Sequence, residues 1–121
     1  MKTILLVDDD VDFRLLIETK LPRKSVHVIS AENGLECIEK AYAYKPDLII
    51  LDINMPMMNG IETAQKLKSK EETKEIPIIA MTALKTEKNA DNSSYFIDYF
   101  PKPVRFKEFI SKVERLLDLG Y

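Results

Sequence analysis

The sequence predicts an α/β domain in which helices cover both faces of a central parallel sheet. Short, continuous apolar runs are typical of strands that are buried on both faces of such a sheet. Amphipathic helical stripes lie between and after these runs. Because strand and helix patterns alternate along the chain, we expect crossover helices to join neighbouring parallel strands.

The strands are predicted from apolar runs rich in isoleucine, leucine and valine, at residues 4–7, 26–29, 48–51 and 76–81. A weaker fifth run covers residues 95–100. Helices are predicted where apolar residues recur at helical spacing, over residues 13–21, 35–42, 61–67 and 106–117. Asn33 and Glu36 have the spacing of a helix cap, so the second helix is expected to begin beside Asn33.

The segment of residues 84–94 is the exception to this pattern. It is rich in Lys, Thr, Glu, Asn, Asp and Ser, and its only apolar residues are Leu84 and Ala90. The alternation of elements requires a helix here, whereas Asn, Asp and Ser favour turns and caps over helix interiors. We therefore expect a short, frayed fourth helix in this segment.

The composition excludes several classes of site. The chain has three glycines, one cysteine (Cys37) and one histidine (His27), which excludes a glycine-rich nucleotide loop, an internal disulfide and a Cys/His zinc cage. Cys37 and His27 are interpreted as structural residues. The net charge of −2 argues against direct binding of nucleic acid. The apolar runs are too short to span a membrane and the N-terminus has no secretory signal, which predicts a cytoplasmic protein.

Polar residues follow four of the five predicted strands. They are Asp8, Asp9, Asp10, Asp52, Thr82 and Lys102. Aspartates after a strand are commonly helix caps, and Asp10 and Asp12 are interpreted as caps or solvated acids. However, ligands of open parallel sheets bind beyond the carboxyl ends of the strands, and these ends meet at one edge. The convergence of polar groups on that edge favours a functional site.

The residue types at this edge indicate phosphoryl chemistry. Carboxylates held close together repel each other unless a cation joins them. Mg²⁺ prefers one or two carboxylates together with water and phosphate oxygens. A carboxylate nucleophile, Mg²⁺, a lysine and a hydroxyl group are together the components of a phosphoryl-transfer site.

The motifs at the strand ends resemble those of the response-regulator receiver domain of two-component signalling. They are ILLVDDD at residues 4–10, PDLIILDINMPMMNG at 46–60, IIAMTA at 78–83 and Lys102-Pro103. The resemblance covers essentially the whole chain. It implies a doubly wound, flavodoxin-like (βα)5 sandwich of three layers, with five parallel strands in the order 2-1-3-4-5. Because the sequence stops at Tyr121, we expect residues 1–121 to form a single receiver domain without an output domain.

The same resemblance implies a role for each polar residue. Asp52 is expected to be the phospho-acceptor, which takes a phosphoryl group from a phosphohistidine of a histidine kinase. Asp9, Asp52 and the backbone carbonyl of Asn54 are expected to ligate Mg²⁺, with Asp8 acting through water. Lys102 is expected to pair with the incoming phosphoryl oxygens.

Thr82 and Tyr99 are the expected switch residues. Thr82 would donate a hydrogen bond to the attached phosphoryl group, and its loop would follow. Tyr99 would change rotamer on activation, although ordinary packing among its aromatic neighbours explains this residue almost as well. The output is expected on the face of the fourth helix, fifth strand and fifth helix. An unknown downstream protein would bind there, and the chain itself is expected to be a monomer or a weak dimer.

Three features depart from the family pattern, and all concern the expected output face. The segment before Lys102 is short for the family and lacks the usual glycine. Pro101 has no backbone N–H group, so the fifth strand must lie at an edge of the sheet. Arg105 stands at an N-cap position and cannot accept hydrogen bonds from helix amides. The Lys102–Pro103 peptide bond is expected to be cis. Gly60 is expected to adopt a backbone conformation that is unfavourable for other residues.

Two alternative functions remain open. One is a metal-dependent phosphohydrolase of the haloacid-dehalogenase type, although Asn54 stands where the second acid would be expected. The other is a receiver-like interaction module that is never phosphorylated. The set of Asp9, Asp52, Thr82 and Lys102 favours a phospho-acceptor over both. Such a domain phosphorylates and dephosphorylates itself, so we do not expect a turnover enzyme.

Overall fold

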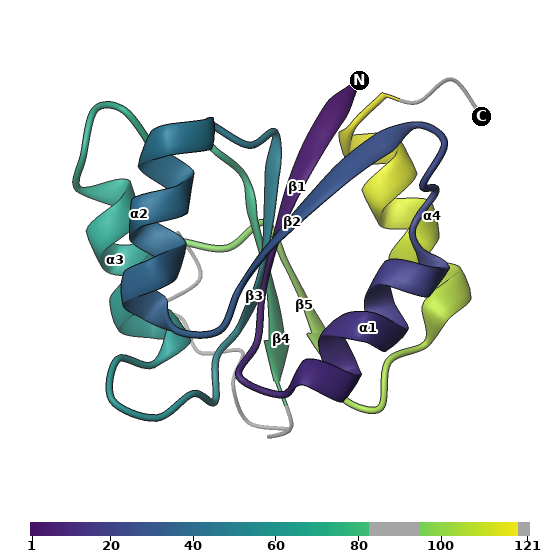
Figure 1. Ribbon diagram of the computed structural model, residues 1–121, viewed down its shortest axis with the longest axis horizontal. Coiled ribbons are helices and arrows are strands. Elements are labelled where there is room, and N and C mark those ends of the chain that lie inside the picture. Colours follow the sequence, from purple (N-terminus) through teal and green to yellow (C-terminus); the bar gives the residue numbers. More distant parts are fainter. Residues whose placement is uncertain (83–94, 119–121) are drawn as a thin grey trace.

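The computed structural model describes residues 1–82 and 95–118, in which five strands form one parallel sheet (Figure 1). The strands are β1 (Lys2–Val7), β2 (Val26–Ala31), β3 (Leu48–Asp52), β4 (Ile78–Thr82) and β5 (Asp98–Pro101). They pair in the order β2-β1-β3-β4-β5, as the resemblance to receiver domains predicted.

Four helices are described, and they cover the two faces of the sheet. They are α1 (Val11–Lys20), α2 (Gly34–Tyr44), α3 (Gly60–Lys68) and α4 (Phe106–Leu116). Figure 1 shows α2 and α3 on one side of the sheet and α1 and α4 on the other. The last helix, α4, is the one predicted at residues 106–117. The frayed helix predicted at residues 84–94 lies outside the described residues.

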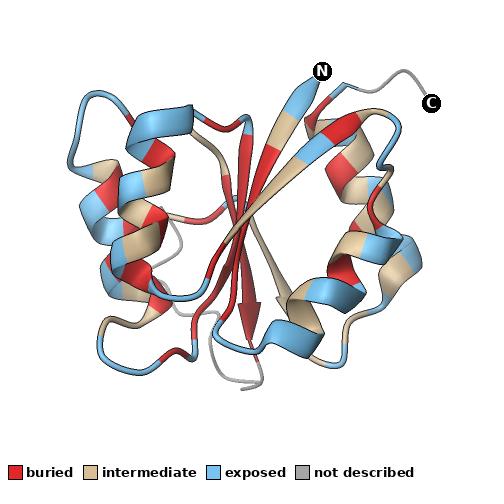
Figure 2. Cartoon of the chain, in the orientation of Figure 1, coloured by how far each residue is buried: buried red, intermediate tan, exposed pale blue. Residues whose placement is uncertain are grey.

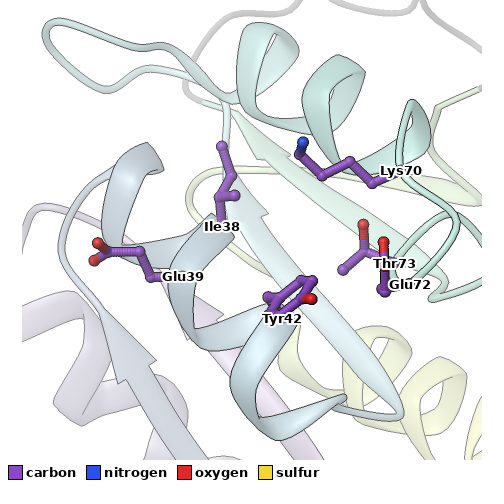
Figure 3. A pocket seen from close by; sticks show the side chains of 6 residues that line it. All are labelled: Ile38, Glu39, Tyr42, Lys70, Glu72 and Thr73. Atoms are coloured by element: carbon purple, nitrogen blue, oxygen red, sulfur yellow. The ribbon is translucent and has the colours of Figure 1, made fainter.

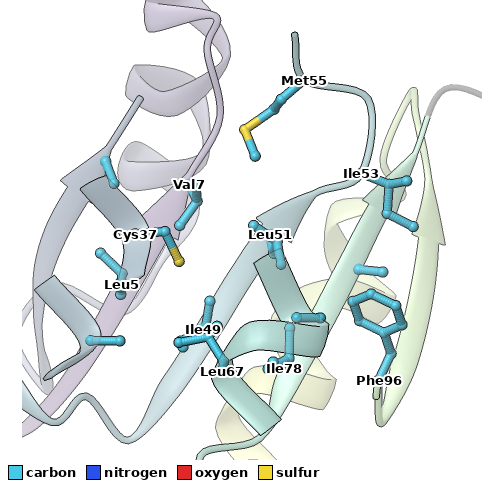
Figure 4. Close-up of a cluster of buried hydrophobic side chains, with 14 residues drawn as sticks. Leu5, Val7, Cys37, Ile49, Leu51, Ile53, Met55, Leu67, Ile78 and Phe96 are labelled. Atoms are coloured by element: carbon cyan, nitrogen blue, oxygen red, sulfur yellow. The ribbon is translucent and has the colours of Figure 1, made fainter. Parts of the chain in front are cut away.

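The continuous apolar runs are explained by burial on both faces, because all residues of β3 and β4 are buried (Figure 2). Alternate side chains of a strand point to opposite faces of the sheet. Leu5 and Ile49 therefore join Cys37 of α2 and Leu67 of α3 in one core cluster (Figure 4). The second cluster, on the other face, includes Ile4 and Ile50 with Ile17 of α1 and Phe109 and Val113 of α4.

The helix starts follow local capping chemistry. Asn33 caps α2 by accepting a hydrogen bond from the backbone N–H of Glu36 at 2.8 Å, which confirms that prediction. Asp10 caps α1 through the N–H groups of Asp12 and Phe13. Arg105 precedes α4 and makes no side-chain capping hydrogen bond, as expected for a side chain without an acceptor.

β5 differs from its prediction, because it covers residues 98–101 rather than the apolar run at 95–100. Phe96 is instead buried before the strand, in the cluster under α2 and α3. β5 pairs with β4 alone and Pro101 is exposed, which confirms the expected edge strand. The Lys102–Pro103 peptide bond is cis, also as predicted.

Gly60 is required for space rather than for an unusual backbone conformation, so the prediction about its conformation was wrong. A Cβ atom at Gly60 would lie 2.5 Å from the backbone oxygen of Asp52 and 2.6 Å from the Cα of Ile53. The left-handed residue of this loop is Met57, with φ of 67°. Gly60 therefore lets the start of α3 pack directly against the end of β3.

Candidate functional site

The acidic residues predicted at the strand ends meet at one edge of the sheet. β1 and β3 are neighbours in the sheet, so Asp8, directly after β1, lies beside Asp52 at the end of β3. One carboxylate oxygen each of Asp8, Asp9 and Asp52 lie within 4.8 Å of one another. Asp8 and Asp52 are only 1% and 3% exposed, whereas Asp9 is exposed. We call these three residues the acid cluster.

Backbone amides hold the two buried carboxylates in place. Asp8 Oδ1 accepts a hydrogen bond from the N–H of Asp10 at 2.9 Å, and Asp52 Oδ1 accepts one from the N–H of Asn54 at 3.0 Å. Each carboxylate thus has one oxygen fixed by the turn that follows its strand. Asp10 itself lies outside the acid cluster and caps α1, which agrees with its interpretation as a cap.

Lys102 supplies a positive charge to the acid cluster. Its Nζ lies 2.8 Å from Asp8 Oδ2 and 3.6 Å from Asp52 Oδ2. The backbone N–H of Lys102 donates to the carbonyl oxygen of Thr82 at 2.7 Å, which ties the lysine to the end of β4. One ammonium group therefore pairs with two of the three carboxylates of the acid cluster, so the cluster has more negative than positive charge.

Burial is the main reason why the pKa of Asp52 is raised to about 6, and repulsion from Asp8 raises it further. The charge of Lys102 and the N–H of Asn54 act in the opposite direction. The carboxyl group of Asp52 is therefore mostly ionised at neutral pH, but at a cost that a second cation would relieve. The acid cluster offers only hard oxygen ligands, and this donor set fits Mg²⁺.

Thr82 and Asn54 are joined across the ends of β4 and β3. The Oγ1 of Thr82 donates a hydrogen bond to Oδ1 of Asn54 at 3.0 Å. Thr82 is buried, whereas Asn54 is exposed at the edge of the site. The hydroxyl group therefore lies at the edge of the sheet where it was predicted, beside the acid cluster. Its hydrogen bond to Asn54 was not predicted.

Tyr99 lies on β5, on the face of the sheet that α2 and α3 cover. Its ring packs against Phe96 with 5.4 Å between ring centroids, and it contacts the core cluster on that face. This environment agrees with the packing interpretation of Tyr99, and its expected role as a switch stays a prediction.

Sequence reasoning missed two residues of α1 that contact the site. Arg14 Nη1 donates to the backbone oxygen of Asp8 at 2.5 Å, and the ring centroid of Phe13 lies 4.2 Å from Nζ of Lys102. Phe13 also fits the apolar stripe of its helix. Both residues lie near the start of the helix that follows β1 and its aspartates, and this position is the signal that could have identified them.

A cleft of about 550 Å³ lies elsewhere, between α2 and the segment after α3 (Figure 3). It is lined by Ile38, Glu39, Tyr42, Lys70, Glu72 and Thr73. None of the strand-end residues contributes to it, so the acid cluster remains the site with a defined chemistry. Among the described helices, none has both the length and the apolar character needed to cross a membrane.

Comparisons with known proteins agree with this geometry. The model of the response regulator receiver domain family matches residues 4–114. The phosphate regulon transcriptional regulatory protein PhoB of Pseudomonas aeruginosa is 36% identical over 118 residues, which are 96% of this chain and 52% of PhoB. The chain thus spans about half the length of PhoB, and the same holds for the CpxR homolog of Haemophilus influenzae and for PhoP of Bacillus subtilis.

Other relatives match along nearly their whole length. The polar-differentiation response regulator DivK of Brucella anthropi is 30% identical, with 96% of each chain covered. The response regulator TrrA of Thermotoga maritima, solved in complex with Mg²⁺-BeF, has a TM-score of 0.87 and 35% identity, with 96% of this chain and 99% of TrrA covered. The fold, the strand-end residues and these matches agree: the chain belongs to the response-regulator receiver domain family.

Proposed function

We propose that this chain is a phospho-acceptor of two-component signalling, in which Asp52 takes a phosphoryl group from a phosphohistidine of a histidine kinase. Receiver domains take phosphoryl groups from histidine kinases, and this chain belongs to that family. The observation that carries the proposal is the buried pair of carboxylates, Asp8 and Asp52, with Lys102 between them. A carboxylate can act as the nucleophile of phosphoryl transfer, and a lysine beside it can stabilise the charge of the transferred group.

The reaction uses Asp52 as a nucleophile. A carboxylate oxygen of Asp52 forms a bond to phosphorus while the bond from phosphorus to the donor's imidazole nitrogen breaks, and that nitrogen keeps the electron pair. Asp52 must be ionised to attack, and its pKa of about 6 leaves it mostly ionised at neutral pH. Lys102 then turns from the carboxylates to the phosphoryl oxygens, whose charge it offsets. Later attack by water on phosphorus breaks the bond from phosphorus to the Asp52 oxygen, which releases phosphate and restores the carboxylate. The proposal is therefore a self-dephosphorylating acceptor rather than a turnover enzyme.

The acid cluster would hold Mg²⁺ during this reaction. Its ligands would be Asp9, Asp52 and the backbone carbonyl of Asn54, with Asp8 acting through water. When bound, Mg²⁺ neutralises carboxylate charge and binds phosphoryl oxygens. Support comes from the three oxygens within 4.8 Å and from the excess negative charge around Lys102.

The switch would begin at Thr82. Its hydroxyl group would leave Asn54 and donate instead to the phosphoryl oxygens on Asp52, where the acceptor is charged and the hydrogen bond is stronger. Reversing a 1:99 population takes about 5.5 kcal/mol, which a few such bonds supply. The loop after Thr82 would follow the hydroxyl group. The change would reach the expected output face, formed by residues 84–94, β5 with Tyr99, and α4, where a downstream protein would bind. In the same proposal, the chain is a cytoplasmic monomer or weak dimer and does not bind nucleic acid directly.

Beryllofluoride with Mg²⁺ tests the proposal, because it mimics the acyl phosphate of an aspartate. We expect titration of the chain to shift the amide resonances near Asp52 and Thr82. Resonances that stay in place would contradict the proposal and favour an interaction module that is never phosphorylated. Many turnovers of a chromogenic phosphate ester per chain would instead favour a phosphohydrolase.

A further inference from the structure

The first turn of α1 contacts both members of the closest ion pair in the site. Arg14 donates to the backbone oxygen of Asp8, and the ring of Phe13 faces the ammonium group of Lys102, whose Nζ lies 4.2 Å from the ring centroid. The Asp10 cap fixes the start of the helix by accepting from the N–H of Phe13 at 3.3 Å. The ring is therefore attached to a backbone that is itself held at the site.

We propose that Phe13 is a positioning residue, whose ring holds the ammonium group of Lys102 in the acid site; this inference rests on the proposed function. A lysine ammonium is strongly hydrated and sits on a flexible four-carbon stem. Asp8 and Asp52 hold it at 2.8 and 3.6 Å, and Phe13 adds a third contact. The face of an aromatic ring attracts a cation within about 6 Å, and the attraction grows when water is excluded.

A ring suits this position because it holds the cation without accepting a directed hydrogen bond. Lys102 must turn from Asp8 toward a phosphoryl group on Asp52 during transfer. A carboxylate or amide at position 13 would hold the ammonium through an oxygen atom and would compete with the phosphoryl oxygens. The Phe13 ring offers no such oxygen, so it keeps Lys102 near Asp52 while leaving its N–H groups available to the phosphoryl group.

The chain contains a matched comparison for this contact. Nζ of Lys20 lies 5.2 Å from the ring centroid of Phe106, so a second lysine faces a phenylalanine away from the acid cluster. Phe13 and Phe106 are both partly buried and pack against the same core cluster. Replacing either ring by leucine removes a similar apolar contact and a cation–ring contact, but only Phe13 faces a lysine of the site.

The test uses the full chain and four proteins: wild type, Phe13→Leu, Phe13→Tyr and Phe106→Leu. The first readout is the maximal rate of phosphorylation by saturating acetyl phosphate with Mg²⁺. We expect Phe13→Leu to lower this rate about fivefold, the size of a partly desolvated cation–ring contact, and Phe13→Tyr to retain it. Phe106→Leu should retain the wild-type rate.

The second readout needs neither metal nor phosphate. In the metal-free wild type, the Lys102 Hε protons should be shifted upfield by the Phe13 ring, and Phe13→Leu should remove this shift while Phe13→Tyr keeps it. An unchanged rate in Phe13→Leu, or a rate that Phe13→Tyr does not retain, would overturn the inference. Should Phe13→Leu fail to fold, Phe13→Met replaces it with the same expected results. A wild-type chain that takes up no phosphate would contradict the proposed function, and the Lys102 resonances would still decide whether Phe13 holds the ammonium.

Discussion

Two carboxylates of this chain, Glu36 on α2 and Asp52 at the end of β3, have opposite relations to their surroundings. Glu36 accepts a hydrogen bond from the N–H of Glu32 at 2.7 Å and pairs with Lys40 at 3.1 Å. The backbone hydrogen bond, followed by Lys40, lowers the pKa of Glu36. Burial and repulsion from Asp8 instead raise the pKa of Asp52 to about 6, despite the nearby lysine.

Ionised Glu36 therefore stabilises the folded protein, whereas ionised Asp52 destabilises it. The folded state favours the ionised form of Glu36, so Glu36 contributes stability above its unfolded pKa and loses it as the pH falls. The folded state disfavours the ionised form of Asp52, so ionised Asp52 lowers the free energy of unfolding. A charge that is poorly stabilised in the free protein is one that a cation or a phosphoryl group can stabilise.

Removing the charge of Asp52 is expected to have the largest effect. Asp52→Asn should raise the free energy of unfolding of the metal-free protein by about 2–3 kcal/mol at pH 7, because it removes a buried, repelled charge. The same variant should lose all acid-labile labelling by acetyl phosphate. Denaturant unfolding and labelling with radioactive acetyl phosphate measure the two effects.

The matched control for Asp52→Asn is Asp12→Asn, which removes the same charge from an exposed position on α1. It should leave the labelling intact and change the free energy of unfolding by less than about 0.5 kcal/mol. Equal labelling of the two variants would remove Asp52 from its proposed role.

The increase in the free energy of unfolding caused by Asp52→Asn should depend on pH. The pKa of Asp52 is raised in the folded state, so the folded wild type binds the proton more tightly than the unfolded chain. The penalty from Asp52 is thus absent below about pH 4 and complete above about pH 6 to 7. The difference in free energy of unfolding between Asp52→Asn and wild type should grow across this range in metal-free buffer. A difference that is independent of pH would contradict the raised pKa.

Mg²⁺ should relieve the same repulsion. Binding to the folded state alone at ten times the dissociation constant stabilises a protein by about 1.4 kcal/mol. We expect this gain for the wild type and a much smaller one for Asp9→Asn, which removes an exposed member of the acid cluster. Thermal unfolding with and without Mg²⁺ measures it. Asp10→Asn, in which asparagine can still cap α1, should retain most of the gain, and equal losses in both variants would argue against the proposed ligands.

The sequence was most informative where one physical rule decides the outcome. The runs in β1, β3 and β4 are buried on both faces, and this burial is visible as uninterrupted apolar residues. The strand order came from resemblance to a family, because periodicity does not determine which strands are neighbours. β5 was misplaced because Phe96 continues the apolar run but belongs to the core before the strand.

The candidate site was likewise predictable only in part. The positions of Asp8, Asp52 and Thr82 at the strand ends predicted that they lie together, since parallel strands end at one edge. The partners of these groups were not predictable: the ring of Phe13 beside Lys102 depends on the direction of a side chain across space. Its apolar character fitted the stripe of α1 equally well, and only the folded arrangement distinguishes the two roles.

The smallest expected effect concerns the other carboxylate of the comparison. Glu36→Gln keeps an oxygen that can accept from the N–H of Glu32 but removes the charge that pairs with Lys40. It should lower the free energy of unfolding by about 0.5 kcal/mol at pH 7, the size of an exposed pair at this helical spacing. The loss should shrink as the pH falls through the lowered pKa of Glu36, where the carboxyl group becomes protonated in the folded wild type as well.

Glu39→Gln is the control for that variant, because it removes the same charge from the next turn of α2. Within residues 1–82 and 95–118, the Glu39 carboxylate has no ion pair. The free energy of unfolding of this control should stay close to that of the wild type in denaturant titrations at pH 7 and at acid pH. Both α2 variants should accept phosphate from acetyl phosphate at the wild-type rate, since neither residue contacts the acid cluster. A gain in stability from Glu36→Gln, as expected for Asp52→Asn, would mean that the two carboxylates do not differ in the way their contacts indicate.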